Sequence, residues 1–216
     1  ALPGSIARPD YAIGDVGVGI VHLGLGAFHR AHQAVYTDAI LHRHPRWGIC
    51  GVSLKTPRVI AALAPQDGLY SVLEKGTEGT AARVIGSVRE VLFLGTERDR
   101  VIARIADPAV HVVSLTVTEK GYCHDPATGR LNVLHPDIAH DLAHPEAPVS
   151  AIGVLVASLR AWDGRGALTG EVEDWERVSS GPARLVVRRR EGDQRRYAKW
   201  FAPDRFSWRR RPGPWG

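Results

Sequence analysis

Short apolar runs alternate with stretches of helical periodicity along the first part of the chain. Residues 19–23 form a compact apolar run that predicts a buried strand, and small apolar residues at spacings of three and four then predict a helix over 27–43. The runs WGICGVSL over 47–54 and VHVVSLTVT over 110–118 predict two further buried strands. Strands that alternate with helices are typical of a parallel sheet that is covered on both faces.

The other segments complete this alternating order. Strand-like runs at 69–74 and 82–88 flank a Lys-Gly-Thr-Glu-Gly segment, which predicts a hairpin. The first helix is expected to end before Pro45, because a proline disfavours the helical conformation in the residue before it. The sequence therefore predicts an α/β fold: a Rossmann-like, mostly parallel sheet with helices on both faces. Further helices are expected over residues 55–64, 98–106, 136–142 and 150–162.

Two glycines, Gly24 and Gly26, stand between the first predicted strand and the first predicted helix. A strand that ends on Gly-x-Gly and opens a helix is the front half of a dinucleotide-binding unit. Gly24 allows a tight turn, and Gly26 leaves room for a pyrophosphate to approach the backbone. The third glycine of the motif is replaced by His29. A chance pair of glycines at a strand-to-helix turn is therefore the alternative.

Three polar residues follow this turn and have more than one interpretation. Arg30 or His29 could contact the phosphate while His32 orients the loop. Alternatively, all three are ordinary polar residues at the exposed start of a helix. His29 and His32 also have a spacing that permits metal binding, but no Cys, Asp or Glu lies close by in sequence to complete a ligand set. No metal site is predicted.

The residues that follow two other predicted strands indicate which cofactor binds and where. Ligands of open α/β sheets lie beyond the carboxyl ends of the strands. After the second strand, the segment that begins at Ser53 has no acidic residue to bind a ribose 2′-hydroxyl but contains Lys55 and Arg58. This pattern favours NADP, unless the segment is simply a solvated loop. Glu119 and Lys120 follow the strand over 110–118 and are expected near the nicotinamide, or else they are charges at the exit of a strand.

The charge balance changes after residue 160. Residues 161–216 carry 13 Lys and Arg against 8 Asp and Glu, together with five of the six Trp, whereas residues 1–160 carry 15 charges of each sign. We therefore expect a dinucleotide-binding domain over 1–160 and an irregular basic tail over 161–216. The basic character of the chain belongs to the tail and says little about the partners of the domain.

Composition also limits the class of protein. A hydrophobic content of 44% is typical of a soluble globular protein. No apolar run approaches the ~20 residues that cross a bilayer, and residues 1–10 lack the order of a signal peptide. Cys50 and Cys123 do not suggest a disulfide framework, so a cytoplasmic protein is expected. A small molecule is the expected partner, with neither nucleic acid nor a membrane.

Several segments taken together are more specific than any single motif. They resemble the mannitol dehydrogenase family over about residues 5–160, and within it they are most similar to the members that act on sugar acids. The segments are IVHLGLGAFHRAHQAVYTDAI, WGICGVSL, QDGLYSVLEKG, SLTVTEKGYCHDPATGRL and HPDIAHDLAHPEAPVSAIG.

The resemblance implies where the cofactor binds and which cofactor it is. In such enzymes the Gly-x-Gly segment opens the nucleotide-binding domain, and the T-E-K-G-Y segment, here 118–122, lies by the nicotinamide. The family works mainly with NAD, against the NADP that Lys55 and Arg58 indicate. We expect NAD, and NADP stays possible. The residues expected to bind the cofactor are Gly24, Gly26, Phe28, His29, Arg30, Ser53, Glu119 and Lys120.

The resemblance stops near residue 160. Such enzymes continue into a C-D-N-x-x-x-N-G segment and a mostly helical second domain with a catalytic lysine, and residues 161–216 do not match this pattern. We therefore expect a truncated NAD-dependent oxidoreductase that binds a nucleotide and catalyses little. No catalytic residue is assigned, and Lys199 is not one because the motif around it does not match. The alternatives are a fragment of a dehydrogenase acting on mannitol, and a non-enzymatic nucleotide-binding or partner-binding module.

Two interpretations of the tail remain open. In a natural fusion, residues 183–190 and 195–201 form a basic hairpin that binds an acidic partner. Otherwise the reading frame changes after about residue 160. In either case a sheet without its neighbouring elements exposes an edge, so self-association through that edge is expected.

Overall fold

A computed structural model describes the backbone of residues 6–77, 79–116, 119–125, 127–162, 176–181, 184–191 and 194–201. The side chains of residues 119 and 120, and those after residue 162, lie outside the described part. The chain forms two compact units, Ala1–Leu168 and Thr169–Gly216.

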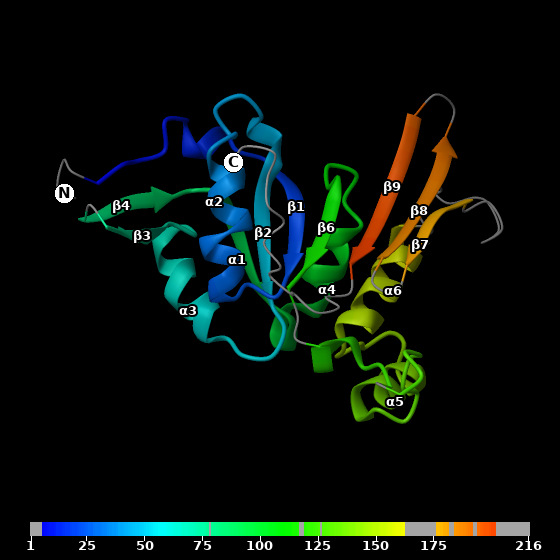
Figure 1. The fold of residues 1–216 in the computed structure, drawn as a ribbon. Coiled ribbons are helices and arrows are strands. Elements are labelled where there is room, and N and C mark those ends of the chain that lie inside the picture. The colour runs from blue at the N-terminus through cyan, green and yellow to red at the C-terminus, as the bar shows by residue number, and fades with distance from the viewer. Residues whose placement is uncertain are drawn as a thin grey trace, which may run out of the picture. The chain divides into compact units, whose positions relative to one another are not determined.

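The first unit is built on a parallel sheet of four strands (Figure 1), β1 (Val18–Leu23), β2 (Gly48–Ser53), β5 (Val88–Phe93) and β6 (Val112–Leu115), in the order β5-β2-β1-β6. The chain adds β2 and then β5 to one side of β1 and returns to the other side with β6. The strand order therefore reverses between β1 and β6. This is the topological switch point where open α/β sheets bind ligands. The predicted α/β, Rossmann-like fold is confirmed.

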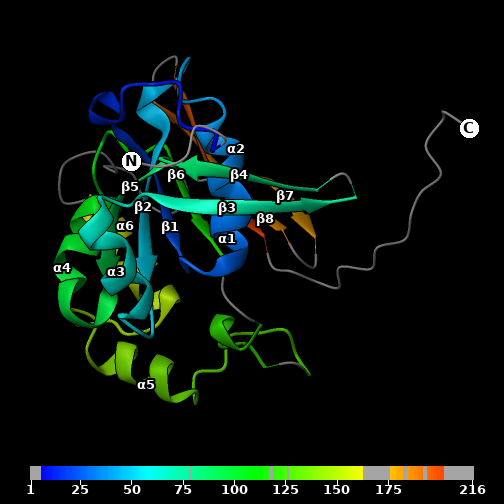
Figure 2. The same cartoon turned by 90° about the vertical axis from the view of Figure 1, so that its left-hand side faces the viewer.

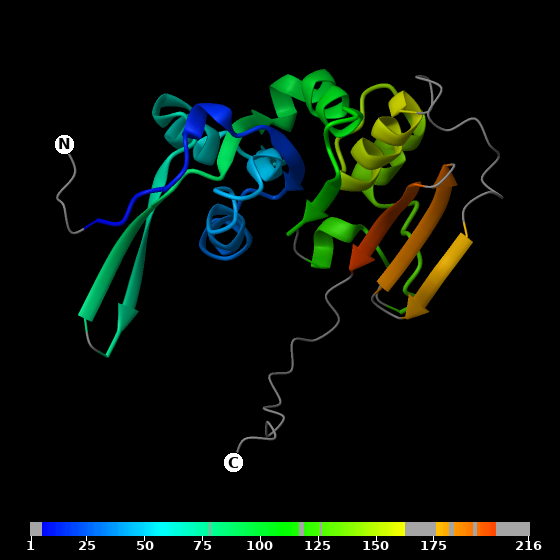
Figure 3. The same ribbon diagram turned by 90° about the horizontal axis from the view of Figure 1, so that it is seen from above.

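Helices cover both faces of the sheet, as the view along the strands shows (Figure 3). Successive residues of β1 point to opposite faces. Val21 and Leu23 pack with residues of α4 (Leu94–Ile105) and α6 (Ala151–Trp162). On the opposite face, Ile20 packs with residues of α2 (Gln33–Asp38) and α3 (Arg58–Leu63). Each inward-facing apolar position contributes about 1.5–3 kcal/mol by burial.

A hairpin of antiparallel strands, β3 (Tyr70–Gly76) and β4 (Gly79–Ile85), is inserted before β5 (Figure 2). Asp38, which is buried at the end of α2, joins this hairpin to the core. Its carboxylate lies 3.5 Å from Arg83 Nη2 of β4 and accepts hydrogen bonds from the Tyr11 hydroxyl and the Gly86 amide. The remaining elements are α1 (Ala27–Ala31), α5 (Pro136–Ala143) and the 3-10 helices η1 (Ile13–Asp15), η2 (Pro45–Trp47), η3 (Ala64–Gln66) and η4 (Glu119–Tyr122).

The structure corrects two predicted elements. The helix expected over 27–43 is interrupted at His32, whose φ of −127° and ψ of −89° are not helical, and it ends as turns after Asp38. The strand expected over 82–88 is the end of β4 and the start of β5, separated by Gly86 and Ser87. The Ser87 hydroxyl donates to the Ala34 carbonyl, which fixes this corner. The strand β5 is hard to recognise in the sequence because it contains charged residues. Such residues are tolerated there since β5 lies at an edge of the sheet.

The second unit contains most of the basic tail expected from the sequence. Its described residues form three antiparallel strands, β7 (Glu176–Gly181), β8 (Arg184–Glu191) and β9 (Gln194–Phe201). The hairpin anticipated over 183–190 and 195–201 corresponds to β8 and β9.

Candidate functional site

The candidate site lies where the chain leaves β1 and β6. Gly24, Leu25 and Gly26 form the turn between β1 and α1. Thr116 follows β6 directly, and its amide donates to the Leu23 carbonyl at 3.0 Å. The carboxyl ends of the two strands therefore meet at the switch point, and the predicted glycine turn is located there.

The two glycines have different roles. Gly24 has a φ of +106°, and a Cβ atom on it would lie 2.4 Å from the Thr116 carbonyl oxygen. The fold itself therefore requires glycine at this position. Gly26 has an ordinary extended backbone, with φ −84° and ψ 178°, and it is exposed. The nearest atom to a Cβ on Gly26 would be the Gly24 carbonyl oxygen, 3.8 Å away. The open space beside Gly26 is thus available to a ligand.

The backbone of the turn is held by several hydrogen bonds. The amides of Gly24 and Leu25 donate to the Val52 carbonyl at 2.9 and 3.1 Å, and the Gly26 amide donates to the Gly24 carbonyl. The Leu25 carbonyl accepts from Arg30 Nη1 at 3.0 Å. Arg30 is half-buried, so its guanidinium lies against the turn where the sequence predicted a phosphate contact.

Two amides beyond this turn have no acceptor among the described residues. In the described part of the chain, neither the N–H of Ala27 nor that of Phe28 finds a carbonyl or a side-chain oxygen. Such unpaired donors at the start of a helix favour an anionic ligand or water. The Phe28 side chain is 64% exposed, so the ring is also accessible from solvent.

His29 is not where the sequence analysis put it. Its ring is fully buried and stacks on His22 of β1, with ring centroids 3.6 Å apart. Neither ring nitrogen has a hydrogen-bond partner among the described residues. Burial lowers the pKa of His22 to about 3 and that of His29 to about 4. A neutral, buried ring cannot reach a phosphate at the surface, so the expected phosphate contact of His29 is wrong in this structure.

Replacing His29 by phenylalanine is expected to preserve stability at neutral pH and to weaken its acid dependence. The phenyl ring keeps the stack and removes two buried nitrogens. Because the folded pKa of about 4 lies below the ~6.5 of an unfolded histidine, the wild type loses stability as pH falls through this interval. Urea denaturation at several pH values measures the change. Equal pH dependence in both proteins contradicts it, and the exposed His32→Phe variant is the control.

A polar cluster lies beneath the glycine turn, and the sequence analysis missed it. Its members come from β1, α2 and the end of β6. In an apolar strand such as β6, polar residues at every second position are a signal that could have revealed it. The cluster consists of His22, Gln33, Ser114 and Thr116.

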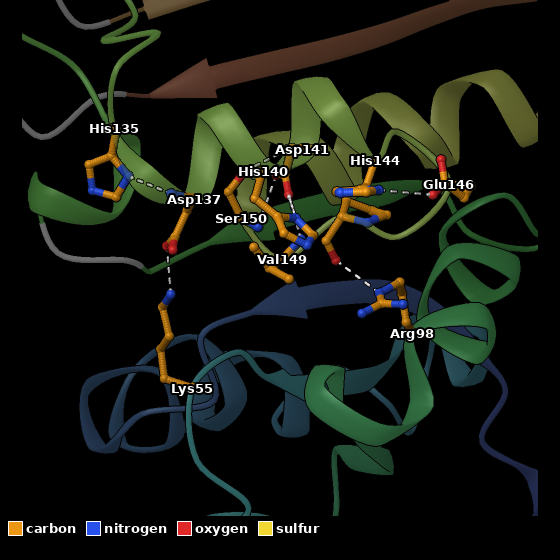
Figure 4. A network of polar contacts seen from close by, with 12 residues as sticks. Lys55, Arg98, His135, Asp137, His140, Asp141, His144, Glu146, Val149 and Ser150 are labelled. Atoms are coloured by element: carbon orange, nitrogen blue, oxygen red, sulfur yellow. Dashed lines mark hydrogen bonds and ion pairs between the residues drawn. The ribbon is translucent and has the colours of Figure 1, made fainter.

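The loop after β2 holds one of its two cations in an ion pair. The Ser53 hydroxyl donates to the Thr56 carbonyl at 2.6 Å and so shapes the loop. Lys55 Nζ lies 2.7 Å from Asp137 Oδ2 of α5 (Figure 4). Arg58 is exposed at the start of α3. One of the two cations that indicated NADP is therefore already paired.

Helix α5 is itself fixed by Asp141. This carboxylate accepts hydrogen bonds from the amides of Val149 and Ser150 at 2.7 and 3.0 Å (Figure 4). Burial opposes ionisation of Asp141, but these hydrogen bonds and that of the Ser150 hydroxyl outweigh it and hold its pKa below the usual value. The Lys55–Asp137 pair therefore joins the loop after β2 to an anchored helix.

Two of the expected cofactor-binding residues, Glu119 and Lys120, have side chains outside the described part. Their backbone forms η4, which follows β6.

Within the described residues no cluster of three or more His, Cys, Asp and Glu could hold a metal ion. His29 and His32, whose spacing permits metal binding, contact different rings: His29 stacks on His22, whereas His32 stacks on Phe28. None of the described helices is long and apolar enough to cross a membrane.

The sequence matches a family model described as the mannitol dehydrogenase Rossmann domain over residues 18–170. An uncharacterized oxidoreductase of Escherichia coli (strain K12), YeiQ, is 45% identical over 76% of this chain and 34% of its own length. The D-mannonate oxidoreductase of the same strain is 46% identical over 72% of this chain and 33% of its own length.

Solved structures agree with the fold. The mannitol 2-dehydrogenase of Pseudomonas fluorescens, in a ternary complex with NAD and D-mannitol, superposes with a TM-score of 0.73 at 40% identity. The match covers 76% of this chain and 35% of that one. This chain thus spans about a third of the length of the relatives that it matches.

Proposed function

The chain belongs to the mannitol dehydrogenase family, and on that premise we propose that its first unit binds a nicotinamide dinucleotide, NAD in preference to NADP, at the switch point between β1 and β6. The observation that carries this proposal is the open space beside Gly26 together with the unpaired amides of Ala27 and Phe28. A pyrophosphate needs close approach to the backbone and N–H donors, and this turn offers both.

The residues of this chain act on the cofactor by binding and orienting it. The amides of Ala27 and Phe28 donate hydrogen bonds to phosphate oxygens, and the Arg30 guanidinium adds a positive charge beside the turn. Glu119 and Lys120, in the segment after β6, flank the nicotinamide end. The loop after Ser53 lies at the carboxyl end of β2, where the adenine ribose is expected. The cofactor, when bound, supplies or accepts the hydride.

The proposed reaction of the whole protein is oxidoreduction at a CH–OH group of a sugar acid, the interconversion of D-mannonate and D-fructuronate. The identity to D-mannonate oxidoreductase supports this substrate, and that to mannitol 2-dehydrogenase supports a polyol as the second candidate. No catalytic group is proposed among the described residues. Incubation with NADH and either fructuronate or fructose separates the two substrates. Nucleotide binding without turnover of either sugar favours a nucleotide-binding module.

NADH is expected to bind more tightly than NADPH. Lys55 is exposed, but its ion pair with Asp137 engages one of the two cations of the loop that would contact a 2′-phosphate, which leaves Arg58 as the other. Parallel titrations of NADH and NADPH, followed by nicotinamide fluorescence, measure the preference. NADPH binding at least tenfold tighter than NADH, a difference of about 1.4 kcal/mol, contradicts the expectation. In that case Arg58→Ala and Lys55→Ala identify the cation responsible.

A further inference from the structure

The polar cluster beneath the glycine turn forms a continuous series of hydrogen bonds. Gln33 Nε2 lies 3.3 Å from Ser114 Oγ, and Ser114 Oγ lies 2.8 Å from His22 Nδ1. On the other side of the ring, His22 Nε2 lies 2.7 Å from Thr116 Oγ1. Thr116 Oγ1 in turn donates to the Gly24 carbonyl at 2.9 Å. The series therefore runs from α2 through β6 and β1 into the turn.

We assign the direction of this series by counting protons, starting from the Thr116 hydroxyl as the donor to Gly24. The Thr116 hydroxyl has one proton, which it donates to the Gly24 carbonyl, so it must accept from His22 Nε2–H. Burial keeps His22 neutral, so its Nδ1 carries no proton and accepts from the Ser114 hydroxyl. Ser114 then accepts from the amide of Gln33. Every donor points toward Gly24.

The last member of the series fixes the orientation of one peptide group. The carbonyl of Gly24 accepts from Thr116, and the N–H of the same peptide, that of Leu25, donates to Val52. Both ends of the Gly24–Leu25 peptide are therefore held. If this peptide rotated, its carbonyl oxygen would point elsewhere, and an oxygen directed at a phosphate would repel it. His29 covers the face of the His22 ring and excludes water from it.

We propose that Thr116 and His22 are positioning residues for the dinucleotide: through the series of hydrogen bonds they hold the Gly24–Leu25 peptide in the orientation that leaves the space beside Gly26 open and the amides of Ala27 and Phe28 available to the phosphates. This inference rests on the proposed nucleotide binding. Neither side chain contacts the cofactor, and both act by removing the alternative conformations of the turn before it binds.

Thr116→Val is the direct test because valine has nearly the same shape and no hydroxyl. The variant is expected to bind NADH about five- to tenfold more weakly, and Thr116→Ser, which keeps the hydroxyl, is expected to bind like the wild type. Thermal unfolding of all three proteins identifies any loss of folded protein. If Thr116→Val does not fold, Ser114→Ala replaces it, with an expected weakening of about threefold.

The position of the proton on His22 gives a second readout, which tests the direction of the series independently of the NADH affinity. Nitrogen-15 NMR of the full chain is expected to find the His22 proton on Nε2. In Thr116→Val it is expected to move to Nδ1, because Ser114 Oγ can instead donate to Gln33 Oε1, 3.3 Å away. A proton on Nδ1 in the wild type overturns the inference, because Thr116 would then donate to His22 rather than to Gly24.

The titrations distinguish a failure of the proposed nucleotide binding from a failure of the proposed positioning role. If the wild type binds NADH and Thr116→Val binds it equally well, this inference fails and the proposed function stands. If the wild type binds no NADH, the proposed function fails and the inference about positioning fails with it. Weak binding in Thr116→Val with rescue in Thr116→Ser supports both.

Discussion

Replacing Gly26 by valine is expected to lower the affinity for NADH at least a hundredfold, a loss of about 2.7 kcal/mol or more. The new side chain occupies the open space beside the turn, where the pyrophosphate is proposed to bind. Because the backbone at Gly26 is extended and a Cβ there meets nothing closer than 3.8 Å, valine fits the folded protein. Calorimetric titration of NADH into the full chain measures the effect.

The stability of this variant is the control. Urea denaturation is expected to place its free energy of unfolding within about 1 kcal/mol of the wild type, as is usual for an exposed substitution. Gly26→Ala adds a smaller side chain and is expected to give an intermediate loss of affinity. Unchanged NADH affinity in a folded Gly26→Val variant would mean that the turn is only a structural element.

Replacing Gly24 by alanine is expected to lower the stability of the fold, whereas Gly26→Val lowers the affinity for NADH. The expected loss in the free energy of unfolding is about 2–4 kcal/mol. A φ of +106° is strained for any residue with a side chain, and the added Cβ would lie 2.4 Å from the carbonyl oxygen of Thr116. Relief of this contact must separate the ends of β1 and β6. Urea denaturation of the variant and the wild type measures the loss.

Gly129→Ala is the matched control for Gly24→Ala. Gly129 also has a positive φ, +66°, but a Cβ on it meets nothing within 4 Å. Its replacement is expected to cost only the backbone strain, about 1–2 kcal/mol. If Gly24→Ala destabilises the chain no more than Gly129→Ala does, then the close approach of β1 and β6 at Gly24 is not what requires glycine there.

The glycine turn could be predicted because its signals are local. An apolar run, two glycines and a change of period lie within residues 19–35, and the structure places the turn at the switch point that the fold type implies. The parallel strands β1, β2 and β6 were also predicted, since all three read as apolar runs, although only β1 and β2 are largely buried. The start of the edge strand β5 was instead joined to the end of β4 in the prediction, and the rest of β5 was missed. Arg89 and Glu90 interrupt the apolar pattern of β5.

The burial of His29 could not be predicted because its partner, His22, is polar and no sequence rule pairs two buried histidines. A histidine after a glycine turn is expected at the surface, yet its ring packs on another histidine near the end of β1. The same limit applies to Lys55. Its pairing with Asp137 joins residues 82 positions apart, and only the fold brings them together. Local sequence thus identified the turn but not the side chains that support it.

The central claim is that the turn from Gly24 to Phe28 binds the pyrophosphate of a dinucleotide. Titration of NADH into the isotope-labelled full chain, followed by the backbone amide signals in NMR, tests it most directly. The account predicts that the amides of Gly26, Ala27 and Phe28 shift most, saturate together, and no longer shift in Gly26→Val. Saturable shifts confined to another part of the chain, such as the β3–β4 hairpin, or no shifts at all, would contradict it.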